Sequence, residues 1–231
     1  MTAAHDPLYD HDGWWDPGCR GFASLRSIST FRLDLLRRWL PGPWRDRTVV
    51  DLGCGGGLLA VPLAADGARV VGVDLARRAL LAGARRGERL FQPVGGDILQ
   101  PPVADACADL VLLADVLEHV DDPRTVVAAA AALVRPGGHL FINTIHRTAR
   151  ARLLAITLAE GLGFVPRGTH LWRRFVAPAE LERFAGAAGL QLVRQVGEVP
   201  RLFATLRRGA IALRESDSLA VAYGALYRRR A

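Results

Sequence analysis

Residues 50–57 read VDLGCGGG, and this glycine-rich segment lies between a short β-branched run and an apolar stretch of helical length. The run at 48–52 predicts a buried strand, and residues 58–65 predict a helix. Glycines at a strand-to-helix turn let the backbone approach a ligand closely, and the helix that follows presents free N–H groups. The segment therefore predicts a ligand-binding turn, of a kind that nicotinamide and flavin enzymes also use.

Three aspartates narrow the choice of ligand. Asp74 ends the next predicted strand, where a carboxylate can accept both hydroxyls of a ribose, and Asp97 follows the third strand after two glycines. Asp51 stands just ahead of the turn, which reads D-x-G-x-G-x-G. That pattern resembles the first motif of class I methyltransferases more than the G-x-G-x-x-G of dinucleotide enzymes, and in that resemblance Asp97 contacts the adenine amine. The predicted cofactor is S-adenosylmethionine (SAM).

The competing interpretation is that the glycines only form a turn. For any single glycine this explanation is as good as the functional one. The ordered set of glycines and aspartates, followed by Pro-Gly-Gly at 136–138 before an apolar strand, favours the cofactor site. The glycines predicted to bind the cofactor are Gly53, Gly55 and Gly57.

Along the rest of the chain, predicted strands alternate with predicted helices. After a first helix at 24–40, strands are expected at 48–52, 69–73, 90–94, 109–114, 139–144, 190–196 and 219–226, with helices at 58–65, 76–86, 123–134 and 177–188. This order implies an α/β fold with a doubly wound, mostly parallel seven-stranded sheet, Rossmann-like as in class I methyltransferases. We expect one domain over 1–231, with a helical N-terminal cap at 1–45 and a lid or insertion at 146–175.

Composition narrows the classes of partner. Half of the 231 residues are hydrophobic, which is enough for a full core. The net charge of +7 invites a nucleic-acid interpretation, but Lys is absent, and this indicates biased base composition as much as a binding surface. The three cysteines are too widely spaced for a disulfide framework or a zinc cluster. Residues 1–6 show no leader and no apolar run is long enough to span a membrane, so we expect a cytoplasmic protein, with peripheral membrane contact as an open alternative.

Residues 115–119 read DVLEH and follow the fourth strand, at the sheet edge where ligands bind. If the chain is helical there, Asp115, Glu118 and His119 share one face and can hold a divalent cation such as Mg²⁺. A cation beside a catechol would lower the pKa of its phenol and hold two adjacent oxygens. Glu118 and His119 are therefore predicted catalytic residues. The alternative is that Glu118 caps or pairs while His119 packs against the cofactor.

His146, just past the fifth strand, is a further catalytic candidate. An imidazole at a strand end can act as a general base in place of the cation, or beside it. The alternative is that His146 is polar surface.

These residues together resemble the ubiquinone-biosynthesis O-methyltransferases, which methylate polyprenylated catechols. The resemblance rests on residues 14–17 (WWDP), 22–33, the glycine turn, 116–120 (VLEHV), 136–138 (PGG), 168–170 (GTH) and 175–181 (FVAPAEL). It implies a SAM-dependent O-methyltransferase that acts on a phenolic oxygen of a polyprenylated quinone precursor. By position it also implies SAM contacts at Arg32, Gly53, Asp74 and Ala114, and metal ligands at Asp115, Glu118 and His119. The family typically has Glu at position 115 and Asn at position 146.

Residues 146–175 combine arginines with apolar side chains such as Leu153, Leu162 and Trp172. Apolar residues flanked by cations suit a segment at a membrane surface, where an isoprenoid substrate would be collected. The alternative is a lid helix that packs its apolar side on the core, and one helix can do both.

The sequence is also compatible with other functions. SAM binding is also compatible with methylation of a natural-product small molecule, or with a non-catalytic SAM-binding protein. A nucleic-acid methyltransferase is disfavoured, because the fourth strand is followed by neither an Asn/Asp-Pro-Pro-Tyr motif nor a Pro-Cys pair. The predicted partner is a small aromatic or quinone-precursor substrate, with no nucleic acid.

Overall fold

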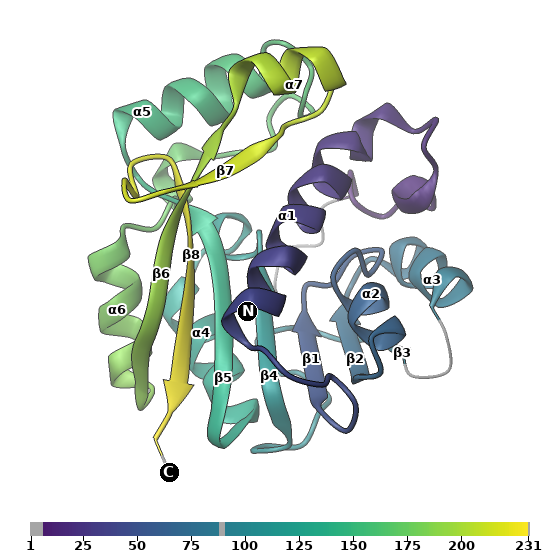
Figure 1. The fold of residues 1–231 in the computed structure, drawn as a ribbon, viewed down its shortest axis with the longest axis vertical. Coiled ribbons are helices and arrows are strands. Elements are labelled where there is room, and N and C mark those ends of the chain that lie inside the picture. The colour runs from purple at the N-terminus through teal and green to yellow at the C-terminus, as the bar shows by residue number, and fades with distance from the viewer. Residues whose placement is uncertain (1–6, 88–90, 231) are drawn as a thin grey trace.

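The computed structural model describes residues 7–87 and 91–230, and its framework is one mixed sheet with strand order β3-β2-β1-β4-β5-β8-β6-β7 (Figure 1). The first five strands are mutually parallel, and β8 runs antiparallel between β5 and β6. The strands are β1 (Thr48–Leu52), β2 (Arg69–Asp74), β3 (Phe91–Gly95), β4 (Ala108–Ala114), β5 (Val134–Ile145), β6 (Leu190–Pro200), β7 (Leu213–Ser216) and β8 (Ala222–Arg229). The predicted Rossmann-like, mostly parallel sheet is confirmed.

The central strands are apolar on both faces because helices cover both. In β1, Val49 packs with one helical layer and Val50 with the opposite one, as the two-residue period of a strand requires. One layer contains α1 (Ala23–Trp39) and α2 (Ala60–Ala65), and the other contains α4 (Pro123–Leu133) and α6 (Pro178–Ala187). The strand order reverses between β1 and β4, and in such sheets a ligand binds beyond the carboxyl ends at this point.

The structure differs from the prediction mainly at the ends of elements. The turn predicted at 135–138 is part of a longer β5, whose register against β4 shifts there. The helix expected from residue 58 begins at Ala60, and the third strand begins at Phe91, so its predicted first residue, 90, lies outside the described residues. Residues 1–6, on which the absence of a leader was argued, also lie outside them.

Two elements near the C-terminus were not predicted. The helix α7 (Leu202–Arg208) leads into β7, which pairs antiparallel with β6 as an eighth strand. The side chains of Leu202, Phe203 and Leu206 are 62%, 82% and 66% exposed. At seven residues, α7 is shorter than the window of about 11–18 residues over which helical periodicity can be recognised in a sequence.

Short helices make up the remaining segments. Residues 146–175 contain α5 (Ala149–Ala151), which continues as the π-helix η4 (Arg152–Glu160), and the 3₁₀ turn η5 (Trp172–Arg174). Figure 1 shows α5 and α7 together above one end of the sheet. The other helices are α3 (Arg77–Arg86) and the 3₁₀ turns η1 (Gly13–Trp15), η2 (Arg20–Phe22) and η3 (Leu117–His119). In the described part of the chain, no helix combines the length and the apolar character that crossing a bilayer requires.

Candidate active site

The glycine turn is fastened to the end of the neighbouring strand. The amides of Gly53 and Cys54 donate to the carbonyl of Val73, at 2.8 and 3.2 Å. Gly53, Gly55 and Gly57 all have left-handed φ angles, of 73°, 52° and 74°. Side-chain-bearing residues rarely adopt this conformation, so the predicted glycines are required by the backbone of the turn itself.

Asp74 joins the turn to the next strand through its carboxylate. One oxygen accepts a hydrogen bond from the amide of Gly55 at 2.7 Å, and the other accepts from Ala76 at 2.8 Å. Asp51, which is 3% exposed, lies nearby. Burial, followed by the charge of Asp74, raises the pKa of Asp51 to about 7.

A cavity of about 170 Å³ opens beside these carboxylates. Six of the residues predicted to bind the cofactor line it: Arg32, Asp51, Gly53, Gly55, Asp74 and Ala114. The other two do not. A Cβ on Gly57 would meet Val61 and Phe91, and the carboxylate of Asp97 accepts from the amide of Leu99 at 2.9 Å. We call this space the cofactor cavity.

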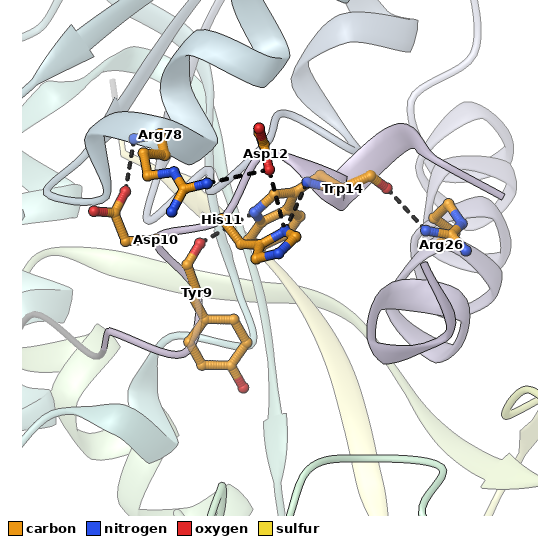
Figure 2. Close-up of polar contacts among 8 residues, drawn as sticks. Tyr9, Asp10, His11, Asp12, Trp14, Arg26 and Arg78 are labelled. Carbon is orange, nitrogen blue, oxygen red and sulfur yellow. Dashed lines mark hydrogen bonds and ion pairs between the residues drawn. The ribbon is translucent and has the colours of Figure 1, made fainter. Parts of the chain in front are cut away.

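Part of the wall of the cofactor cavity comes from the N-terminal residues, whose role sequence reasoning missed (Figure 2). Tyr9 and Trp14 line the cavity, and the indole of Trp14 donates to the carbonyl of Tyr9 at 3.1 Å. The carboxylate of Asp10 accepts from the amide of Arg78 at 2.6 Å, and Arg26 donates to the carbonyl of Trp14 at 3.1 Å. The only sequence signal was the WWDP stretch, which supported the family resemblance without indicating a contact.

A second, larger cavity of about 470 Å³ adjoins the first. Most of its wall is apolar and comes from the N-terminal segment, the insertion at 146–175 and the C-terminal strands and helix. It is lined by all three residues of the predicted metal site, and it shares five residues with the cofactor cavity: Tyr9, Leu25, Arg32, Asp115 and His119. We call it the acceptor cavity.

Arg32 lies where the two cavities meet and is 3% exposed. Its guanidinium pairs with Asp115 and donates two hydrogen bonds of 3.1 Å to Glu198. Burial lowers the pKa of Arg32, but the charges of Asp115 and Glu198 more than offset this and raise it above its ordinary value. Asp115 has a φ of 55°, in the left-handed region that residues with a side chain rarely adopt.

Glu118 is a buried carboxyl group of the acceptor cavity. It is 2% exposed and accepts a hydrogen bond from the hydroxyl of Thr144 at 2.9 Å. Burial, followed by the charge of Asp115, raises the pKa of Glu118 to about 8, so the group is mostly protonated at neutral pH.

Asp115, Glu118 and His119 do not fit a divalent cation as they are arranged. The chain between them forms the 3₁₀ turn η3 rather than the expected α-helix, and Asp115 precedes it with a left-handed backbone. The carboxylate of Asp115 also forms an ion pair with the guanidinium of Arg32, so it already has a positive partner. Among the described residues, no group of three His, Cys, Asp or Glu side chains is placed to hold a metal ion.

The predicted base His146 lies apart from these residues. It lines neither cavity, its Nδ1 lies 3.0 Å from the carbonyl oxygen of Leu219, and its ring packs edge-on against Tyr223. A different histidine, His170, lines the acceptor cavity, with Nδ1 3.0 Å from a carboxylate oxygen of Glu160. The GTH stretch was noted for the family resemblance, but nothing in it pointed to Glu160.

Comparisons with known proteins identify the family of the chain. A family model described as a methyltransferase domain matches residues 25–195. The chain is 42% identical to a ubiquinone biosynthesis O-methyltransferase of Ralstonia nicotianae over 184 residues, which cover 77% of this chain and 76% of that protein. It is 40% identical to the protein of the same name from Thiobacillus denitrificans, with 80% of each chain covered. The chain belongs to the ubiquinone biosynthesis O-methyltransferase family.

Solved structures of other methyltransferases confirm the fold of this chain. A SAM-dependent methyltransferase of Thermotoga maritima, described as a possible histamine N-methyltransferase, aligns with a TM-score of 0.71 at 19% identity and covers 96% of this chain and 100% of its own. Magnesium protoporphyrin IX methyltransferase of Synechocystis aligns with a TM-score of 0.64 at 18% identity, with 91% and 85% covered. At these identities the likeness concerns the fold alone.

Membership in the ubiquinone biosynthesis O-methyltransferase family confirms three predictions made from the sequence. These are the family itself, a SAM-dependent O-methyltransferase activity, and SAM as the methyl donor. The roles of individual residues stay predictions, to be tested one by one.

Proposed function

We propose that this enzyme transfers the methyl group of SAM to a phenolic oxygen of a quinone precursor that carries an apolar tail. The observation that supports this most is the junction of the two cavities at Arg32, Asp115 and His119. The first cavity has the carboxylates and glycine amides that suit a nucleoside, and the second is apolar and nearly three times larger.

Each part of the site has a distinct task in this proposal. Asp74 would hold the ribose hydroxyls, and the turn at Gly53 and Gly55 would face the rest of the cofactor. Bound SAM supplies a methyl group on a sulfonium, which a phenolate attacks more readily than a phenol does. The acceptor oxygen would lie beside His119 and the protonated Glu118, which can donate a hydrogen bond to it.

The predicted divalent cation receives no support from the arrangement of Asp115, Glu118 and His119, and we derive no step through it. Whether methyl transfer requires a divalent cation is tested by measuring the transfer rate in EDTA and in Mg²⁺. Equal transfer rates in EDTA and in Mg²⁺ would remove the cation from the proposal, whereas loss in EDTA and recovery with Mg²⁺ would establish it.

Contact with a membrane surface is the second part of the proposal. The exposed side chains of Leu162, Leu202 and Leu206 also line the acceptor cavity, so its rim is apolar and open. Exposed arginines, including Arg167, Arg201 and Arg207, lie in the same two segments. Apolar side chains with neighbouring cations favour an anionic bilayer, from which a tailed acceptor could enter the cavity.

Flotation with liposomes of anionic or neutral lipid tests this contact. The double variant Phe203→Glu/Leu206→Glu should lose binding to the anionic liposomes. Leu81→Glu, on α3 and 46% exposed in the native chain, is the matched control and should float like the wild type. Equal flotation of all three proteins would refute the contact.

The acceptor itself is tested with methyl-labelled SAM. We expect labelled O-methyl product from a prenylated catechol, slower transfer to the same catechol without its tail, and none to the matching dimethyl ether. Transfer only to amines, or only to DNA or RNA included in the same screen, would refute a phenolic acceptor.

A further inference from the structure

The insertion carries a carboxylate that is fixed by several hydrogen bonds. Glu160 ends the π-helix η4 and is 6% exposed. One of its oxygens accepts from the amide of Gly168 at 2.7 Å, and the other accepts from the amide of His170 at 2.9 Å. A buried carboxylate that accepts two backbone hydrogen bonds has a defined position, which it can impose on a third partner.

That third partner is the imidazole of His170, whose Nδ1 lies 3.0 Å from the same Glu160 oxygen that the His170 amide contacts. Since a carboxylate only accepts, Nδ1 carries the proton and Nε2 keeps a lone pair. The ring is therefore oriented by Glu160, with Nε2 as the nitrogen that can accept a proton.

His170 lines the acceptor cavity and not the cofactor cavity. Its ring centroid is 6.1 Å from that of His119, which lies at the junction of the two cavities, and 6.0 Å from that of Phe175. With Nδ1 bonded to Glu160, Nε2 is the ring nitrogen left for a ligand. An acceptor hydroxyl that reaches the junction thus has an oriented imidazole near it, from a residue that lines the acceptor cavity and not the cofactor cavity.

We propose that His170 is the general base of methyl transfer and that Glu160 is its positioning residue, an inference that rests on the phenolic acceptor proposed above. The O–H bond of the phenol breaks and its proton moves to Nε2. A phenolic oxygen–methyl bond forms as the methyl–sulfur bond breaks, and that electron pair stays on sulfur to give the neutral thioether. The imidazolium is balanced by Glu160 and returns its proton to water.

The alternative is that the Glu160–His170 hydrogen bond only stabilises the loop at 160–170. Two methyl-accepting substrates distinguish this structural role from the general-base role. An unsubstituted catechol must lose its proton to react, whereas nitrocatechol is largely ionised at neutral pH and needs no base. A base variant therefore slows the first acceptor and spares the second, while a misfolded loop slows both.

The variants are His170→Gln and Glu160→Gln, with His139→Gln and Glu182→Gln as matched controls outside both cavities. With catechol, His170→Gln should lower kcat by about 10²-fold or more and Glu160→Gln by about 10-fold, because base catalysis contributes on the order of 10²–10⁴. With nitrocatechol, kcat should stay within about threefold of the wild type, and the dissociation constant for SAM should not change. The two controls should match the wild type with both acceptors.

Equal losses with the two acceptors, or no loss with either, would overturn the general-base role and leave the proposed function standing. Failure of the wild type to methylate any catechol would overturn the proposed function and this inference with it. Circular dichroism shows whether His170→Gln folds. If it does not, the test rests on Glu160→Gln, for which kcat with catechol is compared with kcat with nitrocatechol in the same way.

Discussion

The indole Nε1 of Trp15 donates a hydrogen bond to the carbonyl of Gly56 at 2.7 Å, joining positions 41 residues apart. The neighbouring indole, that of Trp14, lies against the backbone of Gly55 and Gly56 so closely that a Cβ on either glycine would overlap it. The glycine turn is therefore contacted from the outside by the chain's own N-terminal segment. Gly55 is thus required both by its left-handed φ and by the packed indole of Trp14, whereas Gly56 is required by the indole alone.

Gly56→Ala tests the contact with Trp14. Gly56 has an ordinary φ, so the added methyl causes no backbone strain and acts only by displacing the indole. We expect SAM to bind roughly tenfold more weakly by calorimetry, because part of the cavity wall is lost. Gly186→Ala is the control, since a Cβ there meets nothing within 4 Å, and unchanged SAM affinity in Gly56→Ala would contradict the role given to Trp14.

Asp74→Asn tests the cofactor carboxylate while keeping its shape. The side chain accepts from the amides of Gly55 and Ala76, and only one Asn oxygen can replace the two carboxylate oxygens. SAM affinity should fall by about 10–100-fold, the range for charged hydrogen bonds. The exposed Asp105→Asn should bind like the wild type, and equal affinities in all three proteins would refute the ribose role.

Asp51→Asn tests whether the buried Asp51 carboxyl group lowers the free energy of unfolding as the pH rises. The folded chain keeps the Asp51 proton up to about pH 7, whereas the unfolded chain loses it near 3.8. Wild-type stability should therefore fall between about pH 4 and 7 relative to the variant, and the difference should stay constant above that window. Urea unfolding should show a gain for Asp51→Asn on the order of 4 kcal/mol at pH 8, since each pKa unit corresponds to about 1.4 kcal/mol. A difference that does not vary with pH would contradict the raised pKa.

Arg32→Met tests the ion pairs at the junction. Removing the guanidinium leaves Glu198 buried and unpaired, which should cost about 3–5 kcal/mol in the free energy of unfolding. The double variant Arg32→Met/Glu198→Gln should recover part of this loss. Arg38 and Glu215 form a comparable but exposed pair, and Arg38→Met should cost less than about 1 kcal/mol. Equal costs for the two single variants would refute the importance of burial.

The sheet could be predicted because its parallel strands are buried on both faces and appear in the sequence as apolar runs, such as 109–114. Their mostly parallel arrangement followed from the alternation with helices. The ends of β5 and β8 could not be predicted in the same way, because the two strands extend as a pair over a register that only the tertiary structure defines.

The candidate site was predictable where a residue follows a strand directly, as with Asp74 and the glycine turn. It was not predictable where contacts join distant segments, as for Trp15 with Gly56, or where the local conformation departs from an α-helix. Residues 115–119 have helical spacing in the sequence, yet in the structure Asp115 has a left-handed backbone and pairs with Arg32, 83 positions earlier. No local pattern contains that information.

Nearly all of the acceptor cavity is built from segments that lie outside the five parallel strands. The exceptions are Ile145, at the end of β5, and Asp115, Glu118 and His119, which follow β4. Substitutions in the insertion at 146–175 and in the C-terminal helix and strands, which line the acceptor cavity and not the cofactor cavity, can alter which molecule is accepted without changing the wall of the donor site. Divergence within such a lineage could thus change substrate preference in small steps, each of which keeps a working methyl donor site.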